Sequence, residues 1–190
     1  NTGSIGSLVG NDLTIPAVNV VAGADFSCTF TNSKTPTVKV QKTTLGGFGG
    51  AFSFSQTNLA SAPANITTTA VNTPTPSSPT AINVSTIGSN VVITETPISG
   101  YVLTGASCTD ANSAVTGNTG SIGSLVGNDL TIPAVNVVAG ADFSCTFTNS
   151  KIPTVKVQKT TLGGFGGAFS FSQTNLASNP ANITTTAVNT

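Results

Sequence analysis

An internal repeat dominates this sequence. Residues 1–73 recur as residues 118–190, shifted by 117 positions, with two differences: Ile152 stands in the place of Thr35, and Asn179 in that of Ala62. Such near-identity indicates a recent duplication, and a fixed period is the signature of a repeat protein. Because the chain starts and stops inside a period, we expect it to be a segment of a longer tandem array.

Two copies of a polar segment with a proline suggest where one repeat ends and the next begins. They are TNSKTP at residues 31–36 and TNSKIP at residues 148–153. Segments of this composition are typical of domain linkers. We therefore expect residues 1–34 to be the C-terminal part of a preceding repeat, 35–151 a complete repeat, and 152–190 the N-terminal part of the following one. A period of 117 residues is too long for a solenoid turn and suits one small sandwich domain.

The composition favours an all-β fold. Thr, Ser and Asn replace the usual charged residues, and Met and Trp are absent. Thr, Val and Ile suit strands, whereas Asn, Gly and Pro suit the turns between strands. A hydrophobic fraction of 38%, with ten Phe, argues against a disordered chain.

Alternating apolar and polar residues predict roughly seven or eight short strands in the complete repeat, and hence a β-sandwich. The predicted segments are 37–43, 51–56, 66–71, 81–85, 90–96, 101–107, 130–138 with a break near Pro133, and 142–149. The LGGFGG segment at 45–50 predicts a turn. The TPTPSSP segment at 73–79 predicts a loop, because Pro cannot donate a hydrogen bond to a strand ladder.

Charge is scarce, which excludes several functions. Only 6% of residues are charged, six Lys balance six acidic residues, and there is no Arg or His. Nothing here would neutralise the phosphates of nucleic acid or an anionic membrane surface. Without His, a Ser-His-Asp triad and an HExxH zinc site are excluded, so we expect neither an enzyme nor a cofactor. Four aspartates lack the spacing of a calcium loop, so no metal is expected: Asp12, Asp110, Asp129 and Asp142.

The sequence predicts no insertion into a membrane. No apolar run approaches the roughly 18 residues that a membrane helix needs. Residues 1–10 lack the basic start of a signal peptide. We therefore expect any secretion signal or anchor to lie outside this chain.

Three segments carry a resemblance to a known family. They are PTVKVQKTTLGGFGGAFSFS at 36–55, VVITETPISGYVLTGASCTD at 91–110, and DFSCTFTN at 142–149. Together they resemble the prealbumin-like repeats of bacterial surface proteins, which are related to the CnaB and SpaA-like domains of adhesins and pilins. The resemblance covers the whole period and both flanking fragments. It implies tandem Ig-like or prealbumin-like β-sandwich domains in an extracellular, non-enzymatic stalk or fibre, and it implies no particular ligand.

The cysteines pair once the period is considered. Three Cys is an odd count, but each period holds two, Cys108 and Cys145, and Cys28 is the copy of Cys145. We predict a disulfide between Cys108 and Cys145, whereas the partner of Cys28 would lie outside the chain. A disulfide favours an oxidising, extracellular location. The alternative is two buried thiols.

A second cross-link follows from the resemblance. CnaB-like domains often join a Lys on the first strand to an Asn on the last through an isopeptide bond, assisted by a buried acid. Alternation places three polar groups after inward-facing apolar residues, and Glu95 is the only Glu in the chain: Lys42, Glu95 and Asn149. The fallback lysine, Lys39, faces outward with Gln41.

A plainer interpretation of these three residues also stands. In it, Lys42 reaches water, Asn149 forms a turn, Glu95 lies at the rim, and the Cys pair is the only staple. If the bond does form, Lys159 and Asn32 of the fragments would offer the same groups to neighbouring repeats.

The sequence thus favours a structural module of a bacterial cell-surface stalk or extracellular filament. The alternative is an adhesin whose repeats bind a glycan or a host protein directly. The expected partners are other copies of the repeat, because a net charge of zero removes long-range repulsion. Three sequons are candidate glycosylation sites: Asn65, Asn83 and Asn182.

Overall fold

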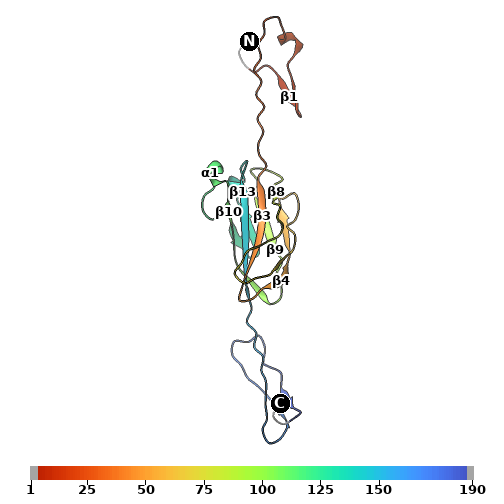
Figure 1. Cartoon of the computed structure of the whole chain (residues 1–190), viewed down its shortest axis with the longest axis vertical. Helices are drawn as coiled ribbons and strands as arrows, with labels where there is room; N and C mark the ends of the chain where they lie inside the picture. Colours follow the sequence, from red (N-terminus) through yellow and green to blue (C-terminus); the bar gives the residue numbers. More distant parts are fainter. Residues whose placement is uncertain (1–3, 188–190) are drawn as a thin grey trace. The chain divides into compact units, whose positions relative to one another are not determined.

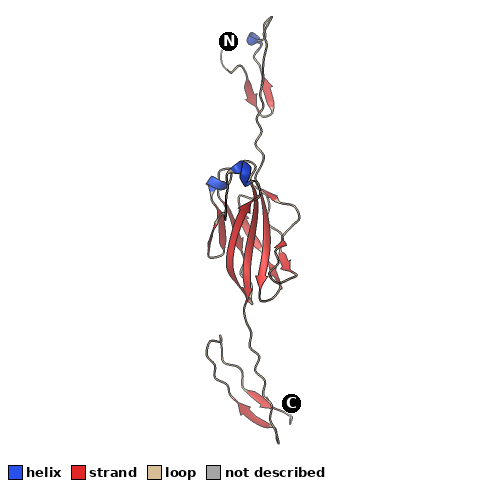
Figure 2. Ribbon diagram, turned by 60° about the vertical axis from the view of Figure 1, so that its left-hand side comes forward, coloured by secondary structure: helices blue, strands red, loops and turns tan. Residues whose placement is uncertain are grey.

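The computed structural model describes residues 4–187 (Figure 1). The chain divides into two compact units, Asn1–Lys34 and Thr35–Thr190. The second unit contains a β-sandwich, formed by β3 to β13 and called here the central sandwich. Figure 2 shows that strands dominate it and that helices are short. Within the described residues, no helix is long and apolar enough to cross a membrane.

The larger sheet of the central sandwich has five strands. Its hydrogen-bonded order is β10-β13-β3-β7, with β8 also paired to β3. The bounds are β3 Thr37–Leu45, β7 Thr75–Pro76, β8 Ile82–Asn83, β10 Tyr101–Asp110 and β13 Asp142–Lys151. β3 and β13, the first and last strands, are parallel, with Thr37 opposite Asp142 and Leu45 opposite Ser150. The chain therefore begins at one end of this sheet and leaves it at the other.

The opposite sheet has four strands, all antiparallel. Its order is β11-β12-β9-β5. The bounds are β5 Phe54–Thr57, β9 Val91–Glu95, β11 Ser124–Val126 and β12 Asp129–Ile132. A further antiparallel pair joins β4 Gly49–Phe52 to β6 Ile66–Thr68.

The core lies between the two sheets. Every second residue is buried in β9, in β13 and in β3 as far as Lys42, so each strand presents a mainly apolar face inward; beyond Lys42, Thr43 and Thr44 of β3 are also buried. The aromatic ring of Phe54 meets that of Phe147 edge-on across the core, with 5.2 Å between centroids. The largest apolar side chains of this core with almost no exposed surface are Phe52, Phe143, Phe147, Ile66, Ile93, Leu130 and Ile132.

The flanking fragments keep only local pairs. The N-terminal unit has β1 Ser7–Val9, β2 Asp12–Thr14 and the 3₁₀ turn η1 Ala17–Asn19, copies of β11, β12 and η2 Ala134–Asn136. The C-terminal segment has β14 Gly166–Phe169 and β15 Ile183–Thr185, copies of β4 and β6. Sequences equivalent to β3 and β13 are not strands in the fragments. Each of these pairs joins strands that are close in sequence. β3 and β13 are far apart in sequence and pair with each other, and each flanking fragment contains the copy of only one of the two.

Several details differ from the sequence prediction. The single strand predicted at 51–56 divides at Ser53 into β4 and β5, which pair with β6 and β9 respectively. The 73–79 segment was predicted as a loop, but Thr75–Pro76 is a short edge strand on Gln41 and Lys42, where the N–H that Pro lacks is not required. The segment predicted at 130–138 ends as a strand at Ile132 and continues as η2. β11 was not predicted, because its SLV sequence is short and largely exposed.

A buried carboxylate organises the end of the central sandwich where β3 begins. Asp110 closes β10 and is 7% exposed. Its Oδ1 accepts the backbone N–H groups of Asn112 and Asp142, at 2.8 and 2.9 Å. Its Oδ2 accepts Thr116 Oγ1 at 2.7 Å and Asn118 Nδ2 at 2.9 Å. These bonds hold the short helix α1, Ser113–Thr116, against the start of β13.

The four hydrogen-bond donors around Asp110 also change the pKa of its carboxyl group. Burial alone would raise the pKa of Asp110, but the hydrogen bonds from Thr116, Asp142, Asn118 and Asn112 outweigh it and lower the pKa below its usual range. A lowered folded-state pKa means that the stabilisation is present above the unfolded-state pKa. It is lost as the pH falls through the folded-state pKa.

We therefore predict that Asp110→Asn lowers the free energy of unfolding at neutral pH by about 3 kcal/mol. The Asn side chain has one acceptor oxygen, and its NH2 group would face hydrogen-bond donors that need an acceptor. The variant should also lose part of the acid dependence of wild-type stability. Urea unfolding at neutral and acid pH measures both effects. Asp129→Asn, at an exposed carboxylate, is the matched control. An equal loss of stability in that control would contradict the prediction.

Candidate cross-linking site

Lys42 lies in the middle of a sheet rather than at its edge. It is opposite Phe147 on β13 and Thr75 on β7. It follows Val38 and Val40 on the inward face of β3, and none of its surface is exposed. Lysine is almost never fully buried unless it is paired, so its partners define the site.

The two partners come from different sheets. Glu95, the last residue of β9, is 1% exposed, and Asn149 on β13 is 2% exposed. Alternation explains both positions, because each side chain follows an inward apolar residue two positions earlier.

The three groups form a closed triangle of hydrogen bonds. Lys42 Nζ donates to Glu95 Oε2 in a buried ion pair. It also donates to Asn149 Oδ1 at 2.5 Å. Asn149 Nδ2 in turn donates to Glu95 Oε1 at 2.6 Å. The amine, the amide and the acid are thus all in mutual contact.

Aromatic side chains line the triangle. Lys42 Nζ lies 4.4 Å from the ring centroid of Phe52 and 5.9 Å from that of Phe147. Phe52 packs edge-on against Tyr101, 5.2 Å between centroids, and Tyr101 donates its hydroxyl hydrogen to the carbonyl oxygen of Phe48 at 3.0 Å. Sequence reasoning missed this role of Phe52, although its place in the alternating AFSFS segment made it an inward residue.

Burial shapes the chemistry of the amine. Removal of water lowers the pKa of Lys42, and the hydrogen bond and charge of Glu95 oppose that shift without cancelling it. Because the pKa of Lys42 is lowered, less free energy is needed to form the neutral, nucleophilic amine. Glu95 is placed to accept the proton that the amine gives up.

The plainer interpretation of these residues does not match their burial. Lys42 does not reach water, and neither Glu95 nor Asn149 lies at an exposed rim or turn. Lys39 belongs to the other face of β3, as alternation predicts. Among the copies, Asn32 is exposed, and Lys159 Nζ lies over the ring of Phe169 at 4.7 Å.

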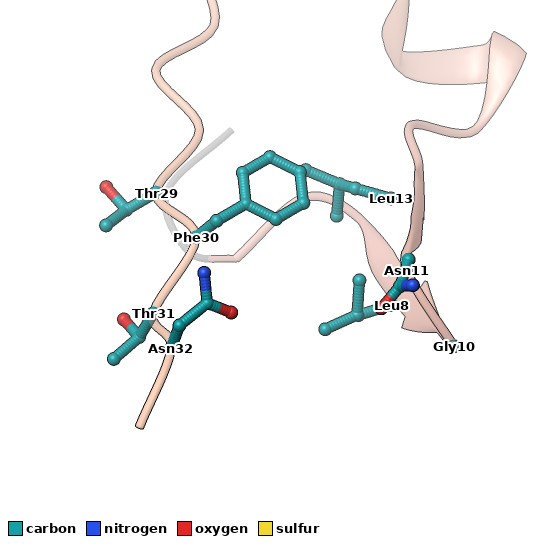
Figure 3. Close-up of a pocket in the computed structure, with 8 residues that line it drawn as sticks. All are labelled: Leu8, Gly10, Asn11, Leu13, Thr29, Phe30, Thr31 and Asn32. Carbon is teal, nitrogen blue, oxygen red and sulfur yellow. The ribbon is translucent and has the colours of Figure 1, made fainter. Parts of the chain in front are cut away.

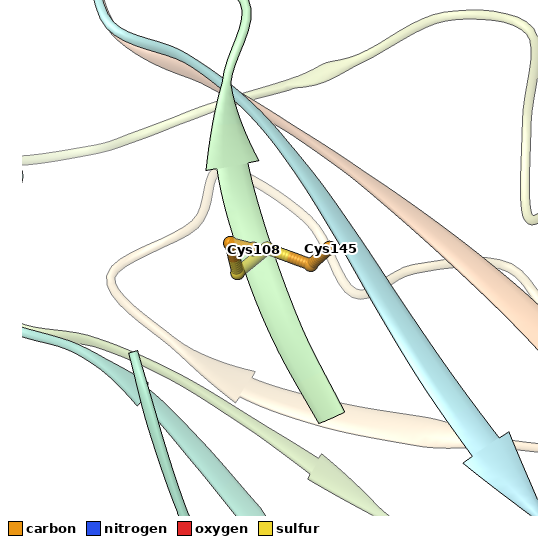
Figure 4. The surroundings of a disulfide bond; sticks show 2 residues. All are labelled: Cys108 and Cys145. Atoms are coloured by element: carbon orange, nitrogen blue, oxygen red, sulfur yellow. A yellow bond between two sulfur atoms is a disulfide. The ribbon is translucent and has the colours of Figure 1, made fainter. Parts of the chain in front are cut away.

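The predicted disulfide is present. Cys108 on β10 and Cys145 on β13 are directly opposite each other and are bonded (Figure 4). Both are at most 1% exposed. Cys28 is a free, exposed thiol.

We predict that replacing the pair by Cys108→Val and Cys145→Ala lowers the free energy of unfolding by about 4 kcal/mol, because the bond closes a loop of 37 residues in the unfolded chain. Equilibrium unfolding in urea measures the change. Cys28→Ser is the control and should leave the stability unchanged. A double variant as stable as wild type would refute this role of the bond.

A hollow in the N-terminal unit does not have the character of a ligand site. Figure 3 shows its lining, which includes Leu13 and Phe30. Their copies in the central sandwich, Leu130 and Phe147, are fully buried core residues. The hollow therefore corresponds to the inner face of half a sandwich.

The candidate glycosylation sites lie on the surface. Asn65, Asn83 and Asn182 are all exposed. The structure thus leaves each sequon accessible, and their modification stays a prediction.

Comparison with known proteins gives one match. Residues 38–151 match the family model SpaA_4, described as a prealbumin-like fold domain. The chain matches no curated protein and no solved structure. The matched range begins and ends within the central sandwich and contains the whole Lys42, Glu95 and Asn149 triangle.

Proposed function

The chain belongs to the SpaA-type prealbumin-like family, and we propose that it is a tandem-repeat segment of a bacterial surface stalk or extracellular filament. Domains of this type are structural modules of pili and adhesins and are generally not enzymes. The observation that carries the proposal is the buried triangle of Lys42, Glu95 and Asn149, which connects the first and last strands of one domain.

In the proposed reaction the triangle becomes a covalent bond. A proton passes from Lys42 Nζ to Glu95, and the neutral amine attacks Cγ of Asn149. The new carbon–nitrogen bond forms as the bond to Nδ2 breaks, and the attacking nitrogen gives up a second proton. Glu95 passes both protons to the departing nitrogen, which leaves as ammonium, and Glu95 ends as the carboxylate that it was at the start. The protein is then lighter by one ammonia. No oxidant and no cofactor is needed.

The position of this bond determines how a pulled domain would respond. β3 begins the central sandwich and β13 ends it, so a force applied at the two ends shears these neighbouring parallel strands. A bond from Lys42 to Asn149 joins residues that are 107 positions apart in the sequence. Force would pass directly through the bond, and everything between the two residues would remain folded.

The disulfide cannot take this role. Cys108 and Cys145 both lie inside the stretch that the Lys42 to Asn149 bond bypasses. The disulfide holds β10 to β13 and restricts the unfolded chain, but it connects neither end of the domain to the other. We therefore assign it to thermodynamic stability and the isopeptide bond to tensile strength.

Other features agree with an extracellular array of like modules. The disulfide suits an oxidising compartment. Because the sequence repeats with a period of 117 residues, we expect the partners of this domain to be further copies of it. The adhesin alternative has less support, because the only Tyr, Tyr101, packs against Phe52 rather than lining an exposed aromatic groove.

The decisive test is the intact mass of the 190-residue chain under reducing conditions. We expect a mass short by one ammonia. Glu95→Ala should restore the full mass because the proton carrier is absent, and Lys42→Arg should do the same. Asp129→Asn, at an exposed acid, should leave the ammonia deficit intact. A full mass in the folded wild-type chain would refute the cross-link.

Single-molecule pulling tests the mechanical role. With the bond in place, only about 10 residues of the central sandwich lie outside it, so extension should release on the order of 30 Å. In Glu95→Ala the disulfide closes 37 of the 117 residues, leaving about 80, or on the order of 270 Å. A long release from chains that have lost ammonia would contradict the proposed path of force.

A further inference from the structure

One strand of the central sandwich has a long open edge. β10 is the outermost strand of the five-stranded sheet, with β13 on one side only (Figure 1). Near its far end a single bridge covers it: Cys108 N–H donates to Ile122 O at 2.8 Å, and Ile122 N–H donates to Cys108 O at 2.7 Å. Over residues 101–107 no described strand pairs with this side of β10.

The backbone of this edge points outward. Because the N–H and C=O of Cys108 face away from β13, those of Ala106, two residues earlier, face the same way. Thr104 has no opposite residue on β13, since a bulge lies between Leu103 and Gly105. Unpaired strand groups of this kind are a template for another strand.

The edge lacks the usual protective residues. Residues 101–107 contain no charged residue and no Pro, and Val102 is 51% exposed. Only the bulge interrupts the row. The other edges of the two sheets are protected or short: β7 and β8 have two residues each in a Pro-rich segment, β11 has three residues, and β5 has four.

We propose that β10 pairs antiparallel with β10 of a second copy of this chain, so that two five-stranded sheets become continuous. Such a contact is self-complementary, because both strands present the same row of donors and acceptors. The strands bring no like charges together, and the chain has a net charge of zero. The proposal rests on the proposed filament function and identifies the surface by which filaments associate side by side.

Tandem repetition would strengthen this contact. If each 117-residue period presents one β10 edge, two arrays share the same edge spacing. Once one β10 pairs with a β10 of the other array, each later β10–β10 pairing between the same two arrays is intramolecular. Many weak pairings can therefore give a high overall affinity between the arrays.

The test is sedimentation equilibrium of the 190-residue chain up to millimolar concentration. Cys28 is alkylated first, because its free thiol would otherwise link chains. We expect a monomer–dimer equilibrium whose dissociation constant rises at least tenfold in Val102→Lys. Ala106→Pro should have the same effect, since it removes an outward N–H that β13 does not use. The amide of Ala106 should gain protection from hydrogen exchange in the dimer.

Val135→Lys is the matched control, the same change at a residue that is 79% exposed on η2. A monomer at the highest concentration, an unchanged constant in both edge variants, or an equal effect in the control would each overturn the β10 contact. The intact mass separates this failure from that of the proposed function. If ammonia is missing but β10 does not pair, the stalk proposal stands and the β10 contact is refuted. If β10 pairs but the mass is full, the β10 contact stands and the cross-link is refuted.

Discussion

The central sandwich is organised around a charge taken out of water. Burying Lys42 without a partner would be strongly unfavourable, and its pairing with Glu95 offsets that only while the two sheets keep their relative position. β3 supplies the amine, β9 the carboxylate and β13 the amide, so one polar contact fixes three strands at once. The surrounding aromatic rings exclude water and keep that contact strong.

The faces of the long strands could be predicted because their alternation is regular. β9 and β13 bury every second residue, and β3 does so as far as Lys42, so the inward positions of Lys42, Glu95 and Asn149 follow from counting. The strand partners could not be predicted in the same way. Alternation determines which face is apolar, but it does not state that β3 and β13 are neighbours or that they are parallel.

Features that depend on contacts between residues distant in sequence could not be predicted from local sequence patterns. Thr75–Pro76 becomes a strand only because β3 offers it an edge. Asp110 looks like one of several scattered aspartates, and its role appears only when Asn112, Asn118 and Asp142 donate to it. Propensity and periodicity describe local preference, and in these places tertiary contacts decide the outcome.

The parallel arrangement of β3 and β13 has a consequence for the evolution of such proteins. A domain whose first and last strands run in the same direction separates its two points of attachment by the length of a strand, about 30 Å for the ten residues of β13. Duplicating or deleting one period then changes the reach of the molecule without redesigning a junction. Recombination between near-identical repeats would adjust that reach in discrete steps.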